Sequence, residues 1–183
     1  MKEKKIIFVI FIIIATILLS GCSEENQSNQ NKKTKTISLK DLGLRTEDLP
    51  NGYIQYYMKD SYLSEFSNQS SESLVKWFFN SSNSNLTYAS LITCELNKFN
   101  STIDASQRLK DTIDFLISDR NFSVINDSIN QFGDESKSLE KDGFTDLLTF
   151  RISNIIVVMS SPDYSFTIDL AKIIEQRIKN SYY

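Results

Sequence analysis

The order of apolar and polar positions divides the chain into a short apolar leader, a polar segment and a long mixed region. Ile6 to Leu19 is a run of fourteen residues in which only Thr16 carries a polar side-chain group. Residues 23–36 contain no apolar side chain, and apolar residues then recur in short runs to the end of the chain. We therefore expect three segments, the last being one globular domain: residues 1–21, 22–36 and 37–183.

Two stretches of the third segment have the spacing of amphipathic helices. The first, residues 101–118, opens with Ser101 and Asp104 in an arrangement close to a capping box. The second begins near the sequence Ser161-Pro162-Asp163, which combines a cap, a first-turn proline and an acid suited to the helix dipole. The apolar stripes that this spacing predicts are Ile103, Leu109, Ile113, Leu116 and Ile117 in the first helix, and Phe166, Leu170, Ile173, Ile174 and Ile178 in the second.

The clearest β pattern lies between these helices. Residues 144–152 and 155–160 flank Ser153-Asn154 and predict a hairpin, and the second arm is apolar at successive positions, which is typical of a central strand covered on both faces. Residues 86–99 predict a further strand, with weaker signals at 53–58 and 122–127. The apolar piece Leu74 to Phe79 is expected to form one or two helical turns over a sheet edge.

The order of these elements predicts an α+β fold. We expect an antiparallel sheet of about four to six strands packed with two main helices. The net charge of −3 over 183 residues argues against a nucleic-acid partner. No internal repeat divides the predicted domain.

The leader has the features of a signal peptide. Three lysines precede the apolar run, which is shorter than the roughly 20 residues that a spanning helix needs. The run ends in Leu19-Ser20-Gly21-Cys22, which resembles the lipobox of prokaryotic lipoproteins. This resemblance implies cleavage between Gly21 and Cys22, a diacylglyceryl thioether on Cys22, and a lipid-anchored location at the outer face of the cytoplasmic membrane. The polar residues that follow are expected to form a disordered tether.

The composition excludes several kinds of chemistry. The chain contains no histidine and two cysteines, so it offers no serine–histidine or cysteine–histidine machinery, no imidazole ligand and no zinc ribbon. Cys94 lies in a predicted strand and is interpreted as a buried structural thiol. The acids from Asp134 to Asp146 lack the spacing of a calcium loop. We therefore expect no catalytic residue, no metal and no cofactor.

Aromatic residues are concentrated between Tyr53 and Tyr88. Tyr56, Tyr57 and Trp77 are our candidates for a groove that binds a small ligand, because aromatic faces give large contact areas at little entropic cost. Core packing is the alternative use of the same residues.

The C-terminal part carries a second resemblance. A Gly133-Asp134-Glu135 turn is followed by Phe150-Arg151-Ile152-Ser153-Asn154-Ile155 and a terminal helix. This arrangement is similar to small extracytoplasmic lipoprotein domains of unknown function, a pattern that carries no assigned catalytic residue. By analogy the architecture is loosely like the PsbP and Mog1 type of sandwich, which implies accessory or assembly roles.

Three functions remain open at this point. The first is a non-catalytic, membrane-anchored domain that binds an envelope protein or a small ligand. The second is a histidine-free hydrolase that acts on cell-surface polymers through a pair of carboxylates. The third is a structural accessory of a membrane complex.

Overall fold

The computed structural model describes residues 37–56, 70–82, 91–125, 131–141 and 146–182, all of which belong to the compact unit Thr36–Tyr183. The helices are α2 (Leu39–Leu42), the 3-10 helix η1 (Thr46–Asp48), α4 (Thr102–Ser118) and α5 (Tyr164–Tyr182). The strands are β1 (Tyr53–Tyr56), β2 (Glu72–Asn80), β3 (Leu91–Lys98), β4 (Ser123–Ile125), β5 (Glu135–Glu140), β6 (Leu147–Ile152) and β7 (Ile155–Ser160).

The strands form one antiparallel sheet in the order β1-β2-β3-β7-β6-β5-β4. The predicted α+β class is therefore confirmed, whereas the expected strand number was too low because the sheet has seven strands. The hairpin prediction is confirmed by β6 and β7, which are joined at Ser153-Asn154, where Ser153 adopts a φ of 53°. β7 is buried at every position and lies between β3 and β6, as its apolar run predicted.

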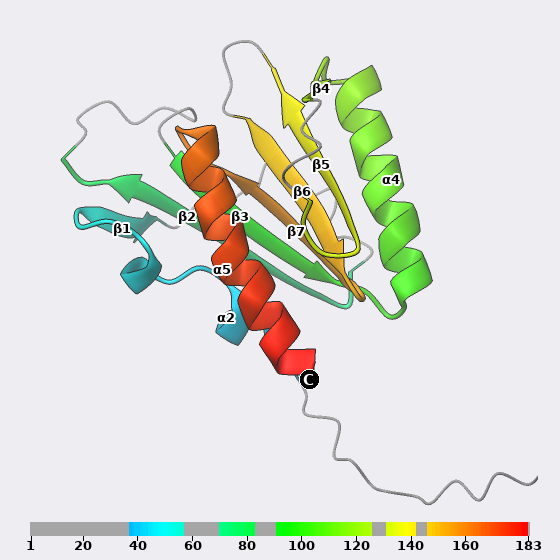
Figure 1. Ribbon diagram of the computed structural model, residues 1–183, viewed down its shortest axis with the longest axis horizontal. Coiled ribbons are helices and arrows are strands. Elements are labelled where there is room, and N and C mark those ends of the chain that lie inside the picture. Colours follow the sequence, from blue (N-terminus) through cyan, green and yellow to red (C-terminus); the bar gives the residue numbers. More distant parts are fainter. Residues whose placement is uncertain (1–36, 57–69, 83–90, 126–130, 142–145, 183) are drawn as a thin grey trace, which may run out of the picture. The chain divides into compact units, whose positions relative to one another are not determined.

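Helices cover both faces of the sheet (Figure 1). Side chains at alternate positions of β3 point to opposite faces. Ile92, Cys94 and Leu96 belong to the face on which α5 packs, which we call the α5 face. Thr93, Glu95 and Asn97 belong to the opposite face, where α4 packs on Ile156 and Val158 of β7, and this is the α4 face.

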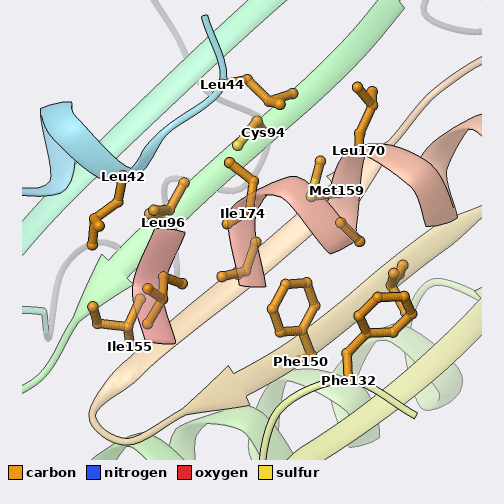
Figure 2. Close-up of a cluster of buried hydrophobic side chains, with 14 of the residues drawn as sticks. Leu42, Leu44, Cys94, Leu96, Phe132, Phe150, Ile155, Met159, Leu170 and Ile174 are labelled. Carbon is orange, nitrogen blue, oxygen red and sulfur yellow. The ribbon is translucent and has the colours of Figure 1, made fainter. Parts of the chain in front are cut away.

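The larger core lies between the α5 face and a layer formed by α5, α2 and the chain after α2 (Figure 2). Leu42, Leu44 and Ile174 enter it from this layer, and Phe150 and Met159 enter it from the sheet. All five are at most 1 % exposed. Burial of side chains of this size contributes about 1.5–3 kcal/mol each before the entropic cost of ordering them, so this layer dominates the stability of the fold.

Helix α4 matches its predicted range but not its predicted stripe. The Ser101 hydroxyl accepts a hydrogen bond from the backbone N–H of Asp104 at 3.0 Å, as the capping pattern implied. Ile103 and Ile117 were expected to face inward, yet they are 80 % and 38 % exposed. The residues of the helix that are buried are Ala105, Leu109, Thr112 and Leu116. Two of these residues, Ala105 and Thr112, have small side chains and can lie against the sheet. A prediction based on the most hydrophobic residues of the helix does not select them.

Helix α5 follows its prediction more closely. Asp163 precedes it and accepts a hydrogen bond from the N–H of Ser165 at 2.8 Å. Leu170, Ile174 and Ile178 are buried, and the remaining predicted stripe residues, Phe166 and Ile173, are partly buried against the same core.

Two strands were not predicted. Leu74 to Phe79 was expected to be helical but lies in β2, where Phe78 faces the α5 side and Trp77 the other. A short apolar run covered on both faces has no period that distinguishes a strand from a helix. The mostly polar stretch that begins at Glu135 carried no strand prediction and forms β5. Among the described residues, no helix has the length and hydropathy needed to cross a bilayer.

Candidate functional site

The α4 face carries an unusual row of polar side chains on a central strand. Thr93, Glu95 and Asn97 of β3 are 9 %, 1 % and 1 % exposed. The Thr93 hydroxyl lies 2.8 Å from the Ser160 hydroxyl of β7. The Asn97 amide donates a hydrogen bond to Oε1 of Glu95 at 2.7 Å. Burial raises the pKa of Glu95 to about 7, although the hydrogen bond from Asn97 acts in the opposite direction.

A groove of about 470 Å³ lies between α4 and β5, a volume within the usual range of small-molecule sites. We call it the α4–β5 groove. Leu109 and Ile113 supply its apolar surface, and the polar residues that line it are Ser106, Gln107, Lys110, Asp114, Glu135, Ser136 and Lys137. The two lysines and two acids balance in charge, so the groove suits a ligand that is neutral overall and has both apolar and polar parts.

One acid of this groove is held by a network around Arg151. The Arg151 side chain is 7 % exposed and donates to Glu135 Oε1 at 2.7 Å and to Asp134 Oδ2 at 3.0 Å. The hydroxyl of Ser106 on α4 also donates to Glu135 Oε1, at 2.8 Å. Partial burial would raise the pKa of Glu135, but the hydrogen bonds from Ser106 and Arg151 outweigh it and the pKa lies below its usual value. Glu135 is therefore an ionised structural acid.

The same network explains the two short motifs that the sequence singled out. Gly133 has a φ of 58°, and a Cβ there would lie 2.2 Å from the carbonyl oxygen of Arg151. The Asp134 carboxylate also accepts from the N–H of Ser153 at 2.8 Å. The Gly-Asp-Glu turn and the Phe-Arg hairpin are thus partners across β5 and β6, and their side chains stabilise the fold.

The structure places two of the three predicted groove residues together. Tyr56 and Trp77 are register partners on β1 and β2, and both lie on the α4 face. Trp77 is 6 % exposed and Tyr56 38 %, and the Tyr56 ring meets Phe79 edge-on with centroids 5.7 Å apart. Tyr57 lies outside the described residues. Ligand binding by these aromatic residues stays a prediction, with Tyr56 as the accessible member of the described pair.

The prediction that Cys94 is a buried thiol is confirmed. Its side chain is fully buried on the α5 face (Figure 2). Burial raises the pKa of this thiol to about 12, so at neutral pH it is neither a thiolate nor a nucleophile.

The acids between Asp134 and Asp146 that the structure describes do not form one cluster. Asp134 and Glu135 join Arg151, whereas Asp142 lies outside the described residues. Burial and the neighbouring Glu140 carboxylate raise the pKa of Asp146. Within the ranges that the structure describes, no three acids or cysteines are grouped as a metal site.

Comparison with known proteins adds no relative. No family model, curated protein or solved structure matches the chain.

Glu95 and Asn97 were not among the sequence candidates. In a strand, polar residues at alternate positions predict a solvated face, and Thr93, Glu95 and Asn97 have this spacing. Only the packing of the fold shows that this row is buried.

Proposed function

We propose that the chain is a lipid-anchored extracytoplasmic lipoprotein whose domain is a non-catalytic binding or accessory module. The observation that carries the proposal is the position of Cys22, directly after Ser20 and Gly21 at the end of an apolar leader. A thiol there is the strongest available nucleophile for attachment of a diacylglyceryl group. Two acyl chains anchor a protein durably, whereas a single chain binds only marginally.

The α4–β5 groove supports the binding part of the proposal. Its apolar residues, Leu109 and Ile113, are flanked by the charged side chains of Lys110 and Lys137. A concave surface with an apolar base and a few polar groups is the usual form of a ligand site. The domain then needs only to present this groove at the membrane surface.

The surroundings of Glu135 argue against a role as the proton donor of a hydrolase. A carboxylate pair for glycoside hydrolysis needs one acid with a raised pKa that serves as the proton donor. The pKa of Glu135 is lowered instead, and its Oε1 is already occupied by Ser106 and Arg151.

The anchor is tested by metabolic labelling with a fatty acid. We expect the wild-type protein to incorporate label and to sediment with membranes, and Cys22→Ala to lose both properties. The matched control is Cys94→Ala, which retains label because Cys94 is buried inside the domain. Equal labelling of wild type and Cys22→Ala would contradict the proposal.

The groove is tested by crosslinked capture from native membranes. We expect Lys137→Glu, which inverts a charge in the groove, to reduce recovery of the specific partner by about tenfold. Lys40→Glu is the matched control, because Lys40 is an exposed lysine on α2 outside the groove. Equal recovery with both variants would show that the groove is not the binding surface.

A further inference from the structure

The buried carboxyl of Glu95 has too few hydrogen-bond donors to be satisfied as an anion. Its Oε1 accepts from the Asn97 amide at 2.7 Å. Its Oε2 and the Asn97 Oδ1 are both buried, and neither has a hydrogen-bond partner. Both atoms are acceptors when the carboxyl is ionised. Two unsatisfied buried acceptors on interacting side chains carry a large desolvation cost.

Among the described residues of β2 and β7, no side chain donates a hydrogen bond to Glu95, and none on this face is charged. Its register partners are Val75 on β2 and Val158 on β7, and both are apolar. The next side chains on this face are Ser73 and Trp77 on β2 and Ile156 and Ser160 on β7. The Ser160 hydroxyl lies 2.8 Å from the Thr93 hydroxyl.

The basic side chains on the α4 face belong to other elements, and one of them, Lys137 on β5, lines the α4–β5 groove. Arg151 on β6 is held by Asp134 and Glu135. Arg108 lies on α4, which packs on this face. In the part of the chain that the structure describes, neither arginine forms an ion pair with Glu95.

We propose that Glu95 is a proton-binding site: as a neutral carboxylic acid it donates its Oε2–H to Asn97 Oδ1, closing a ring of two hydrogen bonds between the two side chains. The proton comes from solvent and forms one O–H bond on Oε2, and no other bond changes. A single proton then satisfies both orphaned oxygens. The direction in which burial moves the pKa of Glu95, upward to about 7, agrees with this assignment.

Proton binding at this position couples the stability of the sheet to pH. Because the folded pKa, about 7, exceeds the ordinary value of 4.5, the folded state holds this proton more tightly than the unfolded chain. The stabilisation is fully present below pH 4.5 and is lost as the pH rises to about 7. The difference between these two pKa values corresponds to roughly a 300-fold change in the unfolding equilibrium constant, reached between pH values well below 4.5 and well above 7. Ionisation leaves charge on the α4 face of β3, between β2 and β7.

The protonation state is tested by titrating the Glu95 side-chain carboxyl resonance in ¹³C-labelled full-length protein in non-ionic detergent. Through-bond correlation assigns the resonance, so the assignment needs no variant. We expect a protonated carboxyl at pH 5.5 and a midpoint near 7. A midpoint near the ordinary value of 4.5 would overturn the proposal.

Unfolding of variants tests the coupling to stability. Glu95→Gln preserves the ring because its amide N–H donates to Asn97 Oδ1 at every pH. We expect the ratio of the wild-type and Glu95→Gln unfolding constants to change by about 80-fold between pH 4.5 and pH 7, and by roughly 300-fold over the whole titration. Glu47→Gln is the control, since Glu47 is 72 % exposed and should leave the wild-type pH profile unchanged. Identical pH profiles for wild type and Glu95→Gln would refute the coupling.

Discussion

Single residues decide how strand β5 pairs with strand β6. Gly133 is the clearest case, because its φ of 58° and the nearby carbonyl of Arg151 leave no room for a side chain. The close approach lets the N–H of Asp134 donate to the Arg151 carbonyl at 2.8 Å, which starts the pairing of β5 with β6. A glycine in a sequence is recognisable as a turn residue, but the requirement for this glycine comes from the carbonyl of Arg151, 18 residues further along the chain.

Gly133→Ala tests this requirement. We expect a loss of roughly 2–4 kcal/mol in the free energy of unfolding, measured with urea, because a strained φ is combined with a backbone clash. Gly52→Ala is the control: Gly52 has a φ of 97°, but the nearest atom to an added Cβ is the Asn80 Oδ1 at 3.3 Å. For Gly52→Ala we expect a loss of about 1 kcal/mol in the free energy of unfolding, because only the backbone conformation is strained. Equal losses in the two variants would mean that the clash with Arg151 is relieved cheaply.

At the scale of elements, α5 is fixed both by its apolar stripe and by one ion pair. Arg177 donates to Asp48 of η1 at 2.6 and 2.7 Å and to the Gly43 carbonyl at 3.1 Å. The Asp48 side chain is 9 % exposed. Burial would raise the pKa of Asp48, but the hydrogen bonds and charge of Arg177 and Arg45 outweigh it and the pKa lies below its usual value. The contact holds η1 and the chain before it against α5.

Arg177→Met should break this contact and leave a mostly buried carboxylate without its partner. We expect a loss of about 2–4 kcal/mol near neutral pH by urea unfolding. Because the folded pKa of Asp48 is lowered, its stabilisation is present above the ordinary value of 3.8 and is lost as the pH falls through the folded value. The variant should therefore lose less stability than wild type on acidification.

Lys172→Met provides the comparison on the same helix. Its partner Asp169 and Lys172 itself are 70 % and 62 % exposed, so the pair contributes roughly 0–1 kcal/mol. A result in which both substitutions cost the same would contradict a specific role for Arg177.

Elements with strong periodicity were the ones that the sequence predicted. Helix α5 carries regularly spaced apolar residues, and the β6–β7 hairpin is marked by two apolar runs that flank Ser153-Asn154, so both are specified locally. β5 could not be predicted in this way, because its sequence is mostly polar and its place in the sheet depends on Arg151 contacts made across the strands. The stripe of α4 was only partly predicted, since contact with the sheet selects Ala105 and Thr112 over Ile103.

At the scale of the whole molecule, a seven-stranded sheet with helices on both faces positions two distinct features. The α4–β5 groove lies at the side of α4, and the Glu95–Asn97 pair lies on the α4 face of the central strand β3. The sequence predicted the class of fold and the burial of Cys94. It could not predict the groove, whose residues come from two elements, nor the burial of Glu95, whose alternation with apolar residues is also typical of a half-exposed strand.

Lipidation of Cys22 is measured most directly by the mass spectrum of the N-terminal peptide of the protein purified from its native membrane. We predict that this peptide begins at Cys22 and that its mass exceeds the sequence mass by a thioether-linked diacylglyceryl group, with or without a further acyl chain on the new amino terminus. An unmodified thiol at Cys22, or a peptide that still carries residues 1–21, would contradict the proposed cleavage and lipidation at Cys22.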